Sequence, residues 1–322
     1  MKYFIYFLLI LLSLIGCQSQ ELGDIFNMLS ANDKTLPCLL SLNVESTNSA
    51  SAQFDEDIVV VKATLDGEKL QYKKLSSSKL QLTFPKPLSV SEAKELYLIV
   101  EDLHGNSSSF IFTISGRNDR IPNIKITEFS SKGTATQPDR IELLAYTEGN
   151  TEGIYCANGT KGNETFGFTL PSIDVKRGDY IVIYWSSKPE KESFTNNTGN
   201  TTYQIEAKSS VKLATNNGCF VLYDTISGNG EILDALVYSD NEATTYSGFG
   251  NAKVEKSYKE LVADFEWIDD PVYSKHTTST RTINRFNGTD DTNKNIDFYI
   301  CDTKCLTFGN SNNEKIYTPP SE

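Results

Sequence analysis

The sequence predicts an all-β protein with two β-sandwiches in tandem behind an apolar leader, and one short helix near residues 253–265. Three observations carry this prediction. The 322 residues are enough for two domains of roughly 150 residues each. Tyr and Phe are abundant, with 16 and 17 residues, whereas Met occurs twice, a composition that suits sheets better than helical bundles. Short alternating or β-branched runs recur along the chain between turn-forming residues.

The net charge of the chain limits the classes of partner that it can bind. Lys and Arg number 30 against 42 Asp and Glu, a formal net charge of −12. Affinity for nucleic acid comes largely from Lys and Arg, so we expect no nucleic-acid partner. The two histidines, His104 and His276, are far apart in sequence, which argues against a His-rich zinc site. No cofactor is predicted.

The first seventeen residues form a leader. An uncharged, mostly apolar run from Tyr3 to Ile15 follows Met1-Lys2 and ends in Leu14-Ile15-Gly16-Cys17. The run is shorter than the roughly 20 residues of a bilayer span, so residues 1–16 are predicted as a signal peptide. The last four residues resemble the lipobox of bacterial lipoproteins. An ordinary secretory signal with a chance cysteine is the alternative.

The lipobox resemblance implies that Cys17 becomes the acylated first residue of the mature chain. Several acyl chains on one residue anchor a protein stably. The membrane would then be one partner, and residues 17–37 would form a lipidated tether. The expected location is the bacterial cell envelope, at the outer membrane or cell surface rather than the inner membrane.

Five further cysteines occur in a chain whose export permits disulfides. The candidate pairs are Cys301 with Cys305 and Cys156 with Cys219, which leaves Cys38. The sequence alone does not settle the connectivity. A structural metal site is a weaker alternative, because the cysteines lack a CxxC spacing and neighbouring histidines.

Residues 38–115 are predicted as the first sandwich. Asp66-Gly67 between two short apolar runs indicates a β-hairpin. The predicted strands are residues 58–65, 68–72, 79–84, 96–100 and 110–114. The run from Ile58 to Val61 is β-branched and is expected to be buried.

The turn before the last of these strands carries Asp102, Gly105 and Asn106 in an Asp-x-x-Gly-Asn motif. This motif resembles the closing hairpin of bacterial immunoglobulin-like modules, which implies an immunoglobulin-like sandwich. The residues themselves are expected to cap the turn and to supply a positive φ. The polar stretch 116–122 is predicted as a linker.

Residues 123–315 are predicted as the second sandwich. Its strands are expected at residues 123–129, 139–145, 166–170, 180–185, 219–224 and 231–238. Residues 186–210 and 241–295 are expected as insertions. The helical spacing of Val254, Tyr258 and Leu261 predicts the helix over 253–265, packed on the sandwich or presented to a partner. Residues 316–322 form a tail.

The order of these segments resembles the lamin tail domain, an immunoglobulin-like sandwich also found in exported bacterial proteins. The resemblance rests on weak motifs in sequence order. They are Ile124, Ile126 and Glu128; Asp139, Ile141, Glu142 and Leu143; Leu222 and Asp224; Leu233, Asp234 and Tyr238; and Thr307, Gly309 and Asn312. Phe308 stands where the family usually has Pro.

Few motifs point to chemistry. The sequence contains no Gly-rich phosphate loop, GxSxG elbow or HExxH motif. Asp291, Asn293, Asn295 and Asp302 partly follow a calcium loop, but Ile296 stands where that loop needs Gly, so a polar loop is the alternative. Trp267 is a weak candidate for stacking on a sugar, whereas Trp185 is expected in the core.

The expected function is therefore non-enzymatic. We expect a lipid-anchored envelope protein with a binding, adhesion or structural role and an unknown protein or glycan partner. One alternative is a carbohydrate-binding module, which predicts Trp267 or a neighbouring Tyr exposed. The other is a metal-dependent hydrolase or phosphoesterase accessory, which predicts three or more acidic or His side chains converging in one cleft.

Overall fold

The computed structural model describes residues 34–226, 230–265, 267, 270–288 and 291–320. The chain divides into two compact units between Arg117 and Asn118, inside the stretch predicted as a linker. Cys17 and the predicted signal peptide lie outside the described residues. Among the described residues, no helix has the length and apolar character needed to span a bilayer.

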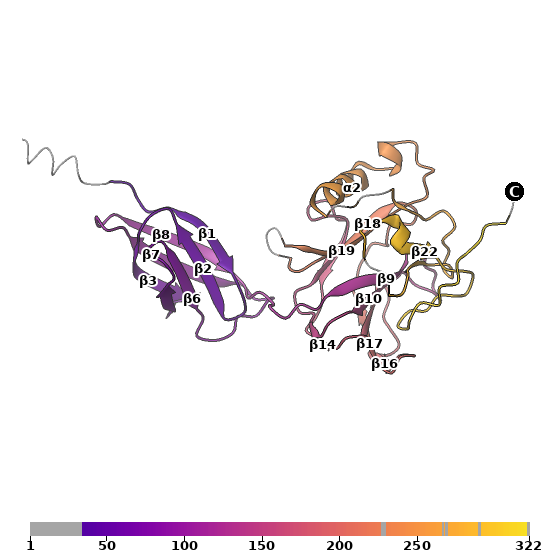
Figure 1. The fold of residues 1–322 in the computed structure, drawn as a ribbon, viewed down its shortest axis with the longest axis horizontal. Helices are drawn as coiled ribbons and strands as arrows, with labels where there is room; N and C mark the ends of the chain where they lie inside the picture. The colour runs from indigo at the N-terminus through magenta and orange to yellow at the C-terminus, as the bar shows by residue number, and fades with distance from the viewer. Residues whose placement is uncertain (1–33, 227–229, 266, 268–269, 289–290, 321–322) are drawn as a thin grey trace, which may run out of the picture. The chain divides into compact units, whose positions relative to one another are not determined.

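The first unit is a sandwich of two four-stranded antiparallel sheets (Figure 1). One sheet has the order β1-β2-β6-β5: β1 Leu39–Val44, β2 Ser49–Phe54, β6 Lys79–Thr83 and β5 Gln71–Lys74. The other has the order β4-β3-β7-β8: β4 Glu68–Lys69, β3 Val59–Leu65, β7 Lys94–Glu101 and β8 Ser107–Ile114. Their alternating apolar residues meet in one core, in which Phe54 and Phe110 have ring centroids 6.0 Å apart.

The two turns predicted from the sequence of this unit are present in the structure. Asp66 and Gly67 both have positive φ, at 48° and 83°, as the tight turn between β3 and β4 requires. The carboxylate of Asp102 accepts hydrogen bonds of 2.8 Å from the backbone amides of His104 and Asn106. The run beginning at Ile58 is only partly buried, because the strand has one open face on which Val59 and Val61 are exposed.

The second unit is also a sandwich, with one long sheet and one shorter sheet. The long sheet has the order β16-β17-β15-β10-β9-β21-β22: β16 Ser193–Thr195, β17 Thr201–Glu206, β15 Tyr180–Tyr184, β10 Arg140–Ala145, β9 Ile124–Ser130, β21 Ile283–Arg285 and β22 Phe298–Ile300. The shorter has the order β13-β12-β18-β19-β20: β13 Gly167–Thr169, β12 Tyr155–Asn158, β18 Gly218–Tyr223, β19 Ile232–Ser239 and β20 Val272–Tyr273.

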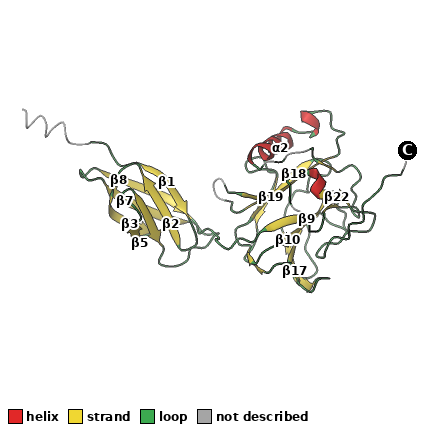
Figure 2. Cartoon of the chain, in the orientation of Figure 1, coloured by secondary structure: helices red, strands yellow, loops and turns green. Residues whose placement is uncertain are grey.

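A small sheet, one helix and two 3-10 turns complete this unit (Figure 2). They are a two-stranded sheet of β11 Gly149–Asn150 and β14 Asp174–Val175, the helix α2 Ala252–Asp264, and the 3-10 turns η1 Tyr246–Gly248 and η2 Asn295–Asp297. The side chain of Asn251 caps α2 by accepting a hydrogen bond from the Val254 amide. Leu261 of α2 is fully buried in the sandwich core, as the helical spacing predicted.

Aromatic rings join the two sheets of this core. Phe220 of β18 lies 5.8 Å from Phe129 of β9 and 5.6 Å from Trp185, measured between ring centroids. Trp185 is fully buried, and its indole nitrogen donates to the carbonyl of Val211. The all-β sandwich class predicted from the sequence is therefore confirmed.

The stretch 186–210 differs from the expectation of an insertion outside the sandwich. It contains β16 and β17, and β17 pairs in parallel with β15, so the stretch extends the long sheet. Its Thr- and Asn-rich sequence lacks the apolar alternation of a core strand because this edge of the sheet is only partly buried.

The predicted disulfides are not formed, since all five described cysteines are free thiols. Strand register explains one case: Cys156 lies opposite Leu222, three residues along β18 from Cys219. That offset is about 10 Å at the usual rise per residue, beyond the reach of a disulfide. The thiol of Cys301 instead lies 3.2 Å from the hydroxyl of Thr282.

The C-terminal segment 307–312 is held against the long sheet by two buried glutamates. The carboxylate of Glu128 accepts hydrogen bonds from the amide and hydroxyl of Thr307, and Glu142 accepts one from the amide of Gly309. Gly309 has a φ of 85°, and an added Cβ would lie 2.5 Å from the ring of Phe194. A side chain there would therefore displace the segment.

Candidate functional site

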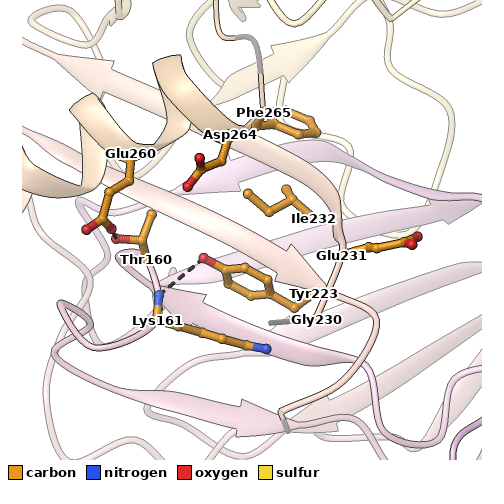
Figure 3. Close-up of a pocket in the computed structure, with 9 residues that line it drawn as sticks. All are labelled: Thr160, Lys161, Tyr223, Gly230, Glu231, Ile232, Glu260, Asp264 and Phe265. Carbon is orange, nitrogen blue, oxygen red and sulfur yellow. Dashed lines mark hydrogen bonds between the residues drawn. The ribbon is translucent and has the colours of Figure 1, made fainter. Parts of the chain in front are cut away.

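A cavity of about 760 Å³ lies in the second unit beside the C-terminal end of α2 (Figure 3). We call it the α2 pocket. Its lining residues are Thr160, Lys161, Tyr223, Gly230, Glu231, Ile232, Glu260, Asp264 and Phe265. A cavity of this volume is in the range that holds a small molecule or a side chain of a partner.

Three separate parts of the chain build the pocket. The loop after β12 contributes Thr160 and Lys161, and the β18–β19 hairpin contributes Tyr223 and residues 230–232. The last turns of α2 contribute Glu260 and Asp264, and Phe265 directly follows the helix. The pairing of β12 with β18, and of β18 with β19, sets the first two parts side by side.

Tyr223 and Lys161 form one wall. The Tyr223 hydroxyl accepts a 3.2 Å hydrogen bond from the Lys161 amide, and the Lys161 Nζ lies 4.6 Å from the centroid of the Tyr223 ring. Burial lowers the pKa of Lys161, while the nearby charge of Asp224 opposes that change. Burial also raises the pKa of Tyr223 to about 12, so the phenol is neutral at physiological pH. The ammonium already covers one face of this ring.

The opposite wall is acidic. Glu260 and Asp264 are one turn apart on α2 and both reach the pocket (Figure 3). The Glu260 carboxylate accepts hydrogen bonds from the Thr160 hydroxyl and, at 2.8 Å, from the Asn163 amide. These bonds fix Glu260 against the β12 loop, whereas Asp264 is exposed.

The third carboxylate, Glu231, lies on the hairpin side of the pocket. It points away from Glu260 and Asp264 in Figure 3, so the three groups do not converge on one point. Within the described ranges, no three His, Cys, Asp or Glu side chains are grouped to hold a metal ion. The arrangement therefore places negative charge beside a partly apolar hollow. Such a hollow can bind a positively charged group.

The residues of the predicted calcium loop are not gathered around one point. The carboxylate of Asp291 pairs with Arg285 at 2.9 Å and with Lys125 at 2.7 Å. Burial alone would raise the pKa of Asp291, but these two cations lower it to about 2. Both Asp291 oxygens are thus already engaged by protein cations.

The other three loop candidates also have structural roles. The Asn293 amide donates to the carbonyl of Phe265, and Asn295 begins the turn η2. Arg285, the partner of Asp291, pairs with Phe298 at the start of β22. Asp302 follows the other end of that strand, away from Arg285. The polar-loop alternative describes these residues better.

Trp267 is in the core and not on the surface. It is 2% exposed, so neither face of its ring is open to a sugar. The backbone amide of Trp267 donates to the carbonyl of Leu261, and its side chain belongs to the core of the second unit. The exposure of Trp267 that the carbohydrate-binding alternative predicts is therefore not found.

Sequence reasoning missed the α2 pocket. The one available signal was the spacing of Glu260 and Asp264, four residues apart on the predicted helix. Nothing in the sequence connects that helix with Lys161 or Tyr223, which lie in segments far from it along the chain.

Comparisons with known proteins give a family match and, among several solved structures, the distant likeness described here. The family model TP_1001_2nd, described as "protein second domain", matches residues 122–300. No curated protein matches the chain. A solved structure of a DUF4785 family protein from Legionella pneumophila subsp. pneumophila strain Philadelphia 1 is 14% identical, with a TM-score of 0.24. The likeness covers 63% of this chain and 55% of that one, so the chain spans about half the length of that structure.

The family match falls on the second unit and accounts for more than half of the 322 residues. It begins four residues after that unit begins and ends with the last residue of β22. The chain belongs to the TP_1001_2nd family.

Proposed function

We propose that this chain is an exported, lipid-anchored envelope protein that binds a basic segment of a partner protein without catalysis. The observation that carries the proposal is the lining of the α2 pocket. Three carboxylates, those of Glu231, Glu260 and Asp264, belong to this lining, which contains one ammonium, that of Lys161. The net charge of −12 would add long-range attraction for a basic partner.

The pocket suits a lysine or arginine side chain. The apolar stem of such a residue can lie on Ile232 and Phe265, while its charged end reaches the carboxylates. The only lysine in the lining, Lys161, lies against the Tyr223 ring. On the acidic wall, Lys256 of α2 lies 3.8 Å from the Glu260 carboxylate, whereas Glu231 and Asp264 are exposed to an incoming cation.

The arrangement supports binding rather than hydrolysis. Glu260 is held by Thr160 and Asn163, and Glu231 points away from the other two acids. A general acid and base pair needs two carboxyl groups directed at one bond. The α2 pocket offers no such pair.

The lamin-tail likeness of the second unit is part of the proposal. Its support is that motif residues distant in sequence contact one another. Glu128 and Glu142 hold Thr307 and Gly309, and Asn312 donates to the carbonyl of Thr127. Phe308, which replaces the usual Pro, lies 4.2 Å from the Arg140 guanidinium, measured to its ring centroid.

The binding proposal is tested with the full chain and synthetic peptides of matched length, one rich in lysine and arginine and one rich in glutamate. We expect the basic peptide alone to bind. The double variant Glu231→Gln/Asp264→Asn should weaken its binding about tenfold, the loss of two partly exposed charge contacts. Both side chains are exposed, so the variant should fold normally.

The matched control is Glu190→Gln/Glu192→Gln, which neutralises two exposed acids that do not line the pocket. It should leave the affinity within twofold. Equal binding of both peptides, or equal losses in the two double variants, would refute the proposal. Binding to a glycan array in place of peptides would favour the carbohydrate alternative.

The anchor is tested separately. Cys17→Ala should move the protein from the membrane fraction to the soluble fraction of cells, because the acylated residue is lost. Immunoblotting of the two fractions measures the shift. A variant that still partitions into detergent would contradict lipid anchoring at Cys17.

A further inference from the structure

A second cavity, of about 530 Å³, lies at the other end of α2. We call it the N-terminal cavity. Its lining residues are Asn158, Gly159, Asn163, Thr165, Val211, Lys212, Ala214, Gly218, Cys219, Asn251, Ala252, Lys253, Val254 and Ser257. It therefore lies between the first turns of α2, the start of β18, the stretch 211–214, and the end of β12 with the loop that follows it.

A hydrogen-bonded partition separates this cavity from the α2 pocket. The Thr160 hydroxyl donates to Glu260 on the side of the α2 pocket. It lies 3.1 Å from the hydroxyl of Ser257 and accepts a 3.0 Å bond from the Asn163 amide on the other side. The two hollows are distinct sites that share one wall.

The polar side chains that line the cavity already satisfy one another or the backbone. The Asn158 amide donates to the Thr165 hydroxyl at 2.9 Å, and the Asn163 amide donates to Thr160 and Glu260. The Asn251 carbonyl oxygen accepts from the amide of Val254. A polar ligand would have to break these hydrogen bonds, which costs free energy. The wall therefore favours contact with an apolar group.

Apart from Lys212 and Lys253, the rest of the lining is apolar or small. Its members are Gly159, Val211, Ala214, Gly218, Cys219, Ala252 and Val254. Cys219 is 2% exposed, and burial raises the pKa of its thiol, so it is a neutral, weakly polar surface. The cavity therefore suits a hydrocarbon group.

Two exposed lysines stand at the edge of this apolar hollow. Neither Lys212 nor Lys253 forms a salt bridge with a residue that the structure describes. The charge of Lys212 also acts on the nearby carboxylate of Asp139. Positive charges beside an apolar cavity are complementary to a molecule with a hydrocarbon body and a negative head.

We propose that the N-terminal cavity binds an acyl chain with a carboxylate head. The chain lies against Val211, Ala214 and Val254, and the carboxylate is held by Lys212 and Lys253. This inference does not depend on the binding of a basic partner in the α2 pocket, because no side chain lines both cavities.

The probe is dodecanoate, with dodecanol as its neutral counterpart. Calorimetric titration of the full chain should give a dodecanoate affinity at least tenfold above that of dodecanol. Hydrogen exchange followed by mass spectrometry should show slower exchange of the amides of residues 211–219 and 251–258 on binding. The exchange measurement distinguishes this cavity from the apolar leader.

Charge reversal provides the decisive comparison. Lys212→Glu/Lys253→Glu should lower the dodecanoate affinity about tenfold or more and leave dodecanol binding unchanged. The control Lys188→Glu/Lys191→Glu reverses two exposed lysines outside the lining and should have no effect. The α2-pocket variant Glu231→Gln/Asp264→Asn should also leave the dodecanoate affinity unchanged. Equal affinity for the two probes, equal losses in the two lysine variants, or no local protection would overturn the proposal.

Discussion

Glu128 and Glu142 face each other as direct partners on β9 and β10, and both are fully buried. Burial raises the pKa of Glu128 to about 7, although hydrogen bonds from Thr282 and Thr307 oppose it. Burial also raises the pKa of Glu142 well above its ordinary value, and the neighbouring charge of Glu128 adds to the rise. The pair therefore keeps at least one proton at neutral pH.

This pair makes the stability of the second unit depend on pH. The native pKa values lie above the ordinary 4.5, so the native state holds protons that the unfolded chain releases above pH 4.5. The free energy of unfolding should fall as pH rises from 4.5 through about 7, by on the order of 3 kcal/mol for Glu128 alone. Urea unfolding at a series of pH values measures it.

The control for this prediction is Glu142→Gln, which removes one carboxyl group and the repulsion between the two. The slope of the free energy of unfolding against pH should become shallower in the variant. An unchanged slope would show that other groups cause the pH dependence.

At the scale of an element, the C-terminal segment closes the long sheet through Asn312. Its side-chain amide donates to the carbonyls of Thr127 and Arg285, and its oxygen accepts from the side-chain amide of Asn284 at 2.9 Å. The same oxygen lies 2.9 Å from the hydroxyl of Thr307. One side chain thus joins β9, β21 and the segment itself.

Asn312→Ala should destabilise the second unit by about 2–4 kcal/mol, because it leaves several buried polar groups without partners. The change in the free energy of unfolding in urea measures this. Asn313→Ala is the matched control: Asn313 is exposed, and water can replace its hydrogen bonds. Similar values for the two variants would contradict the role given to Asn312.

Element prediction from the sequence was successful where periodicity was strong. The helix expected at residues 253–265 spans Ala252–Asp264, because its apolar side chains repeat at helical spacing and Asn251 provides a cap. The strands β16 and β17 were missed because their stability comes from pairing with β15, which a polar local sequence does not reveal.

At the scale of the whole molecule, composition and turn residues were enough to predict the sandwich class. The site was not predictable in the same way. The α2 pocket joins Lys161, Tyr223 and Asp264, which are brought together only by strand pairing and by the packing of α2 on the core. The burial of Trp267 was equally unpredictable, because it comes from packing in the core of the second unit and not from a local pattern.

The central claim is that the α2 pocket selects a basic partner by charge, and a charge swap tests it most directly. The wild-type chain should bind the basic peptide and not the acidic one. In Glu231→Lys/Asp264→Lys, which reverses two exposed charges of the lining, the preference should reverse. Retention of the basic peptide by the swapped chain, with the same affinity as the wild type, would contradict the claim.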